Sequence, residues 1–174
     1  MSFLREGLQV FFRCLGSDFQ ETHQFLQGLP NGSVRLTAKT TDGGTLWTAH
    51  SIQQDFFFEC IGRGFLDGDT GTCRVGLRPN TQFSGTRWRV ADLPDPGTHV
   101  TLQCQGTSGG QCAAQRPDFG GFMDGHTGVN DGNVFLAQNT APPLTGTHWE
   151  LLVAPLGDGL ASVGGGDHIR HIEK

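Results

Sequence analysis

The stretch VFFRCLG at residues 10–16 decides the fold, because two further copies of it follow along the chain. These are FFFECIG at 56–62 and VTLQCQG at 100–106, and the cysteines of the three copies lie 46 and then 44 residues apart. Recurrence at a spacing of about 20–50 residues is the signature of internal repeats. Each copy is rich in aromatic or β-branched residues and ends at glycine, which predicts a strand that runs into a turn.

Three more motifs follow that stretch in the same order in each copy. They read Phe-Leu/Met-Gln/Asp-Gly, then Val-x-Leu, then Gly-Thr-x-Trp. The first stands at 25–28, 65–68 and 122–125, the second at 34–36, 75–77 and 134–136, and the third at 44–47, 85–88 and 146–149. Turn signals such as Asp69-Thr70-Gly71 separate them. We therefore expect an all-β domain of twelve short strands, four in each of the repeats 8–53, 54–96 and 97–153.

The composition restricts the class of protein. The 174 residues include 27 glycines, carry a net charge of −5 and are only 17% charged, and their number suits one domain at 1–153 with a partly flexible tail at 154–174. The acidic balance and the scattered Lys and Arg disfavour nucleic acid as a partner. No stretch reaches the ~20 apolar residues of a membrane span, and the N-terminus lacks the apolar run of a signal peptide. We expect a soluble, monomeric, cytoplasmic protein.

Alternation along strands assigns the three tryptophans to the interior. Thr and Trp of Gly-Thr-x-Trp share one face of a strand, and the residue between them points outward. Because each indole buries about 150–250 Å², we expect all three to meet in one core around a pseudo-threefold axis. They are Trp47, Trp88 and Trp149. Val-x-Leu likewise buries its Val and Leu and turns outward its middle residue, which is Arg35, Gly76 or Phe135.

The complete pattern resembles the β-trefoil fold, and the Trp late in each repeat is similar to that of ricin-B-type lectin domains. The resemblance covers residues 8–153. It implies that the first and fourth strands of each repeat form a six-stranded barrel and that the second and third form hairpins that cap it. It also implies a non-catalytic binding module whose partner is a carbohydrate or glycoconjugate.

In ricin-type domains each sugar site combines an Asp on the second strand, an aromatic platform just after Val-x-Leu and an Asn shortly before the Trp. The resemblance carries the Asp onto Asp67 and Asp124, and repeat one has Gln27 there. The platform positions hold no aromatic residue, since they are Thr37, Arg78 and Ala137. Gly replaces the Asn, and Thr replaces the Gln of the Gln-x-Trp motif in that family.

We expect carbohydrate sites in repeats two and three, formed by Asp67 with Asn80 and by Asp124 with Asn139. Phe135 points outward nearby and is the expected stacking face for a sugar ring. The Asp and Asn residues have a second interpretation, since their side chains also hydrogen-bond the backbone two residues on and so form tight turns. Both interpretations are open at the level of sequence.

The cysteines and histidines point to no metal, cofactor or catalytic centre. Matching strand positions predict buried, reduced thiols at Cys14, Cys60 and Cys104. Cys73 and Cys112 fall in turn or loop regions, where they are free and reactive or paired with each other. No close cysteine pair forms a zinc motif, and no Ser-His-Asp set or phosphate loop occurs. His168 and His171 lie in the tail, where a solvated role is expected.

The third repeat carries an insertion at 107–121 that the other two lack. It includes Cys112 and the run Arg116-Pro117-Asp118-Phe119. Kunitz-type trefoil inhibitors present one exposed loop to a protease, and long loops on rigid scaffolds often bind partners. A protein-interaction module or protease inhibitor acting through this loop is therefore the alternative function.

Overall fold

The computed structural model describes residues 3–16, 24–94, 99–107, 110, 112, 120–126, 132–141, 145–154 and 161–162. Within them the chain is all-β, and its helices are two 3₁₀ turns, η1 (Ser84–Thr86) and η2 (Thr145–Thr147). The strands are β1 (Gln9–Cys14), β2 (Phe25–Gly28), β3 (Val34–Thr37), β4 (Trp47–Ile52), β5 (Asp55–Cys60), β6 (Gly64–Asp69), β7 (Arg74–Arg78), β8 (Trp88–Asp92), β9 (His99–Cys104), β10 (Phe122–Gly125), β11 (Val134–Ala137), β12 (Trp149–Val153) and β13 (Ala161–Ser162). No helix of this described part is long and apolar enough to cross a membrane.

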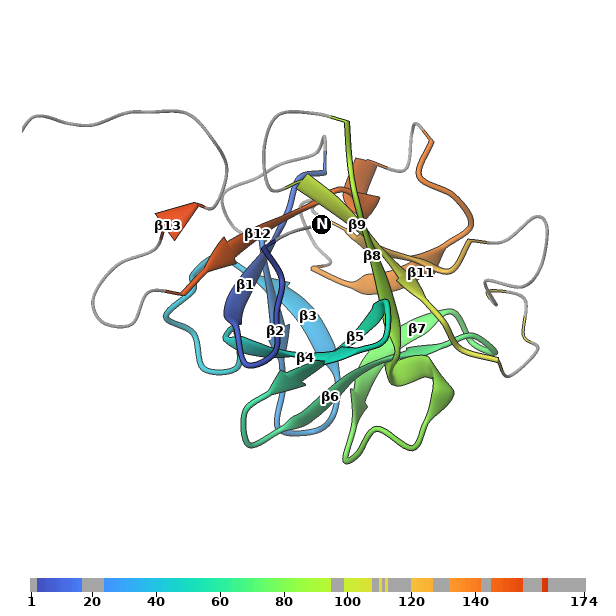
Figure 1. Cartoon of the computed structure of the whole chain (residues 1–174), viewed down its shortest axis with the longest axis horizontal. Helices are drawn as coiled ribbons and strands as arrows, with labels where there is room; N and C mark the ends of the chain where they lie inside the picture. The colour runs from blue at the N-terminus through green and yellow to red at the C-terminus, as the bar shows by residue number, and fades with distance from the viewer. Residues whose placement is uncertain are drawn as a thin grey trace, which may run out of the picture.

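The strands pair antiparallel and close into a barrel (Figure 1). β1 pairs with β12 and β4, β5 pairs with β4 and β8, and β9 pairs with β8 and β12, so these strands form a ring. A longer path leaves β5 through β6, β7, β11 and β10 and returns at β9. Closure leaves the barrel strands without the unpaired edge that makes an open sheet prone to aggregate.

Three hairpins, β2–β3, β6–β7 and β10–β11, join the Phe-Leu/Met-Gln/Asp-Gly motif to the Val-x-Leu motif in each copy, as the resemblance implied. Their tips also join one another. The Cα pairings between hairpins are Ser33 with Gly76, Arg35 with Asn133 and Phe135 with Arg74. Backbone N–H groups cross the same junctions, from Leu36 to Gly132, from Leu77 to Gly32 and from Leu136 to Cys73. The outward faces of the hairpins are therefore held side by side.

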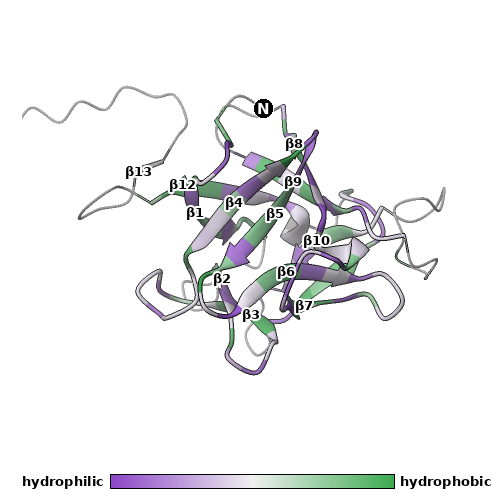
Figure 2. Ribbon diagram, turned by 60° about the horizontal axis from the view of Figure 1, so that its bottom comes forward, coloured by the Kyte–Doolittle hydropathy of each residue, from purple (hydrophilic) through white to green (hydrophobic). Residues whose placement is uncertain are grey.

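The three tryptophans are fully buried, as predicted, and each opens a barrel strand. Each indole N–H donates to a backbone carbonyl of the hairpin that precedes it in sequence, namely Trp47 to Leu26, Trp88 to Leu66 and Trp149 to Met123, at 3.1, 3.0 and 2.9 Å. The ring of Phe12 contacts two of the indoles edge-on, and all belong to one hydrophobic core. Figure 2 shows the hydrophobic stretches that β5 and β12 contribute to the barrel. Burial of the apolar indole rings stabilises the fold, and the hydrogen bonds of their N–H groups avoid the cost of burying an unpaired donor.

The prediction that Gly-Thr-x-Trp is strand throughout is wrong. Each strand begins at the Trp, and in the second and third copies the Gly and Thr lie in η1 and η2. A Cβ on the glycine would collide with a hairpin carbonyl oxygen, in the pairs Gly44 with Gly28, Gly85 with Gly68 and Gly146 with Gly125. The Thr is buried as predicted, and Thr86 Oγ1 donates to the carbonyl of Phe83 at 2.7 Å. A turn rather than a strand brings the glycine this close.

The first-strand cysteines are buried free thiols, as predicted. Each packs on a hairpin-strand glycine of another copy. An added Cβ at Gly28, Gly68 or Gly125 would lie 3.0, 2.7 or 2.7 Å from the sulfur of Cys60, Cys104 or Cys14 respectively. Burial raises the pKa of Cys14 and of Cys104 to about 12. These two thiols therefore stay protonated near neutral pH and act as packing groups, not nucleophiles.

Cys73 and Cys112 form a disulfide with a Cα–Cα distance of 5.5 Å, which decides between the alternatives open in the sequence. Cys73 lies at the tip of the β6–β7 hairpin with φ of 59°, a left-handed conformation. The corresponding tips of the other hairpins carry Gly32 and Gly132, with φ of 83° and 53°. Cys112 N–H also donates to the carbonyl of Thr70 at 3.0 Å. The disulfide thus fixes part of the 107–121 insertion to this hairpin.

Most of that insertion and most of the tail lie outside the described residues. Arg116, Pro117, Asp118 and Phe119 of the expected inhibitor loop belong there, as do His168 and His171. Within the segment predicted as a tail, β13 pairs antiparallel with β12.

Candidate functional site

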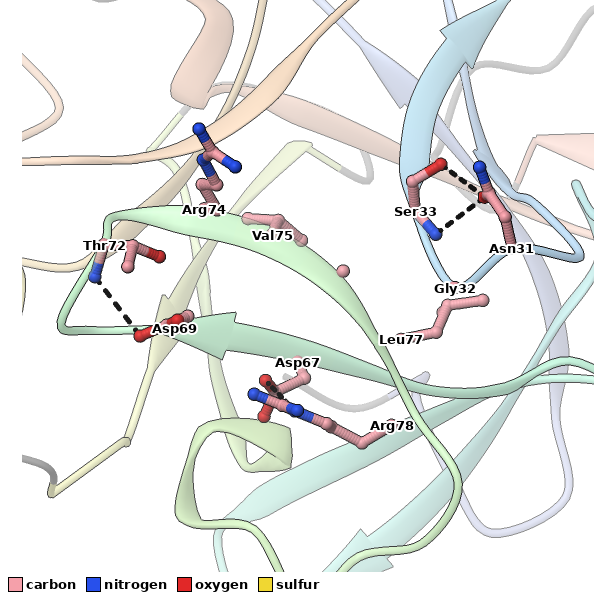
Figure 3. Close-up of a pocket in the computed structure, with 11 residues that line it drawn as sticks. Asn31, Gly32, Ser33, Asp67, Asp69, Thr72, Arg74, Val75, Leu77 and Arg78 are labelled. Carbon is pink, nitrogen blue, oxygen red and sulfur yellow. Dashed lines mark hydrogen bonds and ion pairs between the residues drawn. The ribbon is translucent and has the colours of Figure 1, made fainter.

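A pocket of about 410 Å³ opens between the tip of the β2–β3 hairpin and the outward face of β6–β7 (Figure 3). We call it the hairpin pocket. Polar and apolar groups both line it, and the side chains include both charges; the residues are Asn31, Gly32, Ser33, Asp67, Asp69, Thr72, Arg74, Val75, Gly76, Leu77 and Arg78. It contains one of the two acids predicted as ligand contacts.

Asp67 is buried in this pocket and bonded to Arg78. Its Oδ2 accepts a hydrogen bond from Arg78 Nε at 3.1 Å, and the two side chains point toward one another in Figure 3. The fold makes room for the carboxylate with glycine on two sides. Gly76 stands opposite Asp67 in the β6–β7 register, and an added Cβ at Gly85 would lie only 2.6 Å from Oδ1. Burial raises the pKa of Asp67, and the Arg78 guanidinium partly offsets this.

Arg78 occupies the position where the ricin-type resemblance expects an aromatic platform. Its guanidinium carbon lies 4.8 Å from the centre of the Phe83 ring, which stacks against it. Phe83 is 42% exposed. The arginine is therefore held by a carboxylate and by an aromatic ring, and its remaining N–H donors are fixed in direction. Sequence reasoning does not identify either Arg78 or Phe83 as a functional residue.

Asp69 lies two residues further along the same strand and closes the hairpin turn. Its Oδ1 accepts from the N–H groups of Gly71 and Thr72 at 2.9 and 3.2 Å. Partial burial would raise the pKa of Asp69, but hydrogen bonds from the side chain of Thr72 and from these backbone groups lower it. Asp69 is thus an ionised acceptor at the pocket wall with one oxygen committed to the turn.

Asp124 occupies the matching place on β10 but has different neighbours. It stands opposite Phe135, and Ala137 takes the place that Arg78 has in the other hairpin. Burial raises the pKa of Asp124, and His126 lowers it by a smaller amount. The repeat-three acid therefore lacks an arginine on the neighbouring strand.

Asn80 and Asn139 adopt the turn role that the sequence left open. Asn80 Oδ1 accepts from Gln82 N–H at 3.1 Å, and Asn139 Oδ1 accepts from Ala141 N–H at 3.0 Å. Asn80 is not among the residues that line the hairpin pocket, so the structure does not bring it to Asp67 there. The role of these two residues in binding stays a prediction.

Phe135 lies on the outward face, as predicted, and is 41% exposed. Its ring meets His126 edge-on, with 6.5 Å between the ring centres. It lines a second pocket of about 370 Å³, which shares Ser33, Arg74 and Val75 with the hairpin pocket. The stacking face predicted for a sugar thus adjoins the neighbouring hairpin, and Asn139 is not among the described residues that line this pocket.

Across the described residues, no group of three or more His, Cys, Asp or Glu side chains is placed to hold a metal ion. The chain matches no model of a protein family and no curated protein. Because these comparisons suggest no ligand, we infer what the two pockets can bind from the residues that line them.

Proposed function

We propose that this chain is a non-catalytic β-trefoil module that binds carbohydrate in the hairpin pocket, with Asp67 and Arg78 as its main polar contacts. The trefoil part of the proposal rests on recurrence in three places. Each copy of the four-motif pattern has a buried indole bonded to the preceding hairpin, a cysteine packed on a hairpin glycine and a glycine against a hairpin carbonyl. A ring of barrel strands with three hairpins joined at their tips agrees with it.

The Asp67–Arg78 pair is the observation that supports carbohydrate as the ligand. Sugar hydroxyls both donate and accept hydrogen bonds, so they are matched by a fixed carboxylate beside a fixed guanidinium. Asp67 Oδ2 is oriented by Arg78 Nε, which leaves acceptor capacity on the carboxylate for a hydroxyl. Val75 and Leu77 add small apolar surface to the pocket for the C–H groups of a sugar ring. An open, shallow pocket with charged side chains suits a saccharide better than an apolar ligand.

Two carboxylates in one pocket also occur in glycoside hydrolases, but their surroundings in this chain favour binding. A general acid must hold a proton and release it to the leaving group. Burial raises the pKa of Asp67 and Arg78 offsets this only in part, but the ion pair engages Oδ2 of Asp67. The second carboxylate, Asp69, has a lowered pKa, and its Oδ1 is bonded to its own turn. We therefore expect no hydrolysis of a bound glycan.

A glycan array on the purified protein, followed by titration calorimetry with the best ligand, tests this function. Asp67→Ala should remove binding, and Asp67→Asn should weaken it at least tenfold, because the charge-assisted bond to a hydroxyl is lost. Asp124→Asn is the matched comparison, since it changes the equivalent acid of β10. An affinity within about twofold of wild type would confine the site to the hairpin pocket, and a larger loss would place a second site at Asp124. Retained binding by Asp67→Ala with an unchanged melting curve would place the ligand elsewhere, and a silent array would reject the function.

A further inference from the structure

The second pocket lies where the three hairpins meet, and we call it the junction pocket. Each hairpin contributes the same two positions to it, the first Val of Val-x-Leu and the residue before it. The matched pairs are Ser33 and Val34, Arg74 and Val75, and Asn133 and Val134, with Phe135 as the remaining wall. One ligand in this pocket would therefore touch all three hairpins at once.

The three matched residues of the junction pocket differ in chemistry although their backbones correspond. The valines are nearly buried and form an apolar floor. Above the floor stand a hydroxyl, a guanidinium and an amide, from Ser33, Arg74 and Asn133. Arg74 is the one charged side chain among the described residues that line this pocket. Asp69 is its Cα partner on β6 but does not line the pocket. The chain as a whole carries a net charge of −5, so an arginine on an outward face indicates a local site for an anionic ligand group.

Arg74 and Phe135 face each other across the junction, because they are direct Cα partners in the β7–β11 pairing. In Figure 3 the Arg74 guanidinium points away from Asp67 and Asp69. The ion pairs among the described residues engage Arg78 with Asp67, and none of them includes Arg74. An exposed guanidinium thus stands beside an aromatic ring that is itself 41% exposed.

We propose that the junction pocket binds a carboxylated sugar ring, a uronic or sialic acid residue of a glycan. The carboxylate would pair with the planar fork of Arg74, which matches two carboxylate oxygens. The apolar face of the ring would lie on Phe135 and the valine floor, and its hydroxyls would meet Asn133 and Ser33. A neutral ring would leave Arg74 unused, which is why the acid is preferred.

This inference rests on the proposed function and defines its substrate class. Ser33, Arg74 and Val75 line both pockets, so the two are adjoining parts of one surface. A single oligosaccharide can then place one residue against Asp67 and its acidic neighbour against Arg74. The Asp67 carboxylate would repel an acid, so the charged residue belongs in the junction pocket and not in the hairpin pocket.

Calorimetry with matched ligands, an acidic oligosaccharide and its carboxyl methyl ester, tests the assignment. The acid should bind at least tenfold more tightly than the ester, because the ester cannot form the ion pair. Arg74→Gln should remove that difference and leave binding of the ester within twofold. Arg74→Lys should restore only part of it, since an ammonium lacks the bidentate fork. Phe135→Ala should weaken both ligands by a similar factor.

Arg5→Gln serves as the charge control, because it removes a cation from an exposed position before β1 and should change neither ligand. Equal binding of acid and ester, or an equal loss of both in Arg74→Gln, would overturn the acidic-sugar assignment while leaving the proposed function intact. If neither ligand binds and the glycan array is also silent, the proposed function fails and this inference falls with it. Melting curves of each variant establish that it is folded.

Discussion

The β6–β7 and β10–β11 hairpins share a motif and a register but carry different surfaces. Asp67 and Asp124 hold the same position, and the glycine behind each, Gly85 or Gly146, packs closely on it. In the β6–β7 hairpin Gly76 stands opposite the acid, and Arg78 follows it on the same face. In the β10–β11 hairpin the corresponding residues are Phe135 and Ala137. These two outward positions thus account for the difference between the pocket with an acid–arginine pair on β6–β7 and the aromatic surface on β10–β11. The inward positions maintain the fold, and the outward ones are free to determine binding.

If the two hairpins share one core, removal of their tryptophans should have equal effects, and these should be the largest effects on stability. Trp88→Ala and Trp149→Ala should each lower the free energy of unfolding by about 3–5 kcal/mol, measured by urea denaturation. Trp→Phe variants keep an aromatic ring but lose the N–H bond to the hairpin carbonyl, so the free energy of unfolding should fall by a smaller amount that is again equal at the two sites. These variants provide the test where the alanine variants do not fold. A difference above about 1 kcal/mol between the two sites would contradict the correspondence.

The disulfide is where the two hairpins differ most in covalent structure. It closes a loop of 39 residues, for which the chain-entropy relation gives a stabilisation of about 4 kcal/mol at most. In a Cys112→Ser background, Cys73→Gly should be about 1 kcal/mol more stable than Cys73→Ser, since glycine accepts the left-handed tip at little cost, as Gly132 does in the other hairpin. Chemical denaturation measures both, and equal stabilities would show that the tip conformation carries no strain.

Neutralising the two acids should also separate the hairpins. At pH 7, Asp124→Asn should raise the free energy of unfolding by up to about 1 kcal/mol, because burial disfavours its charge and no arginine stands beside it on β11. Asp67→Asn should be about 1–2 kcal/mol less stable than Asp124→Asn, because it also loses the partly exposed Arg78 bond. An equal response of the two sites in urea denaturation would mean that Arg78 contributes nothing.

The pH dependence gives an independent check on the same pair. An acid whose folded pKa is raised destabilises the native state above that pKa, and this effect disappears as the pH falls through it. Between pH 7 and pH 4 the wild type should therefore gain stability relative to both Asn variants, and more relative to Asp124→Asn. Burial would lower the pKa of His50, but hydrogen bonds to Glu6 and Glu59 raise it, so the charge of this histidine also depends on pH. It is present in every variant and cancels in the difference.

Most of the framework could be predicted because it depends on side-chain alternation within each strand. Burial of Trp47, Trp88 and Trp149, the free thiols of the first strands and the three hairpins follow from motifs whose period matches a pleated strand. The strand prediction fails at the Gly-Thr segment because the conformation there is set by a distant carbonyl. Gly85 of η1 approaches Gly68 of β6, and sequence spacing does not show such a contact.

The site could be predicted less well, because its partners come from neighbouring strands. The motifs identify Asp67, but they mark Arg78 only as a missing aromatic and give Arg74 no role. The outward alternation of these arginines on β7, with Gly76 between them, is a usable signal. The Cys73–Cys112 bond is one of two alternatives at the level of sequence, since chain distance alone says nothing about geometry. Disulfides persist mainly in oxidising compartments, so this bond agrees less well with the cytoplasmic location expected from the sequence.

Moving the arginine from one hairpin to the other is the sharpest test of the comparison, although its expected effect on stability is the smallest. Ala137→Arg combined with Phe135→Gly gives β11 the Gly-x-Arg sequence that β7 has at 76–78, and the register of Asp124 with residue 135 matches that of Asp67 with Gly76. The new ion pair should add at most about 1 kcal/mol to the free energy of unfolding, because it is partly exposed. It should also lower the pKa of Asp124, which carboxyl NMR titration can follow. An unchanged Asp124 titration in the folded double variant would show that the surroundings of the β6–β7 pocket, and not its two outward residues, create the Asp67–Arg78 pair.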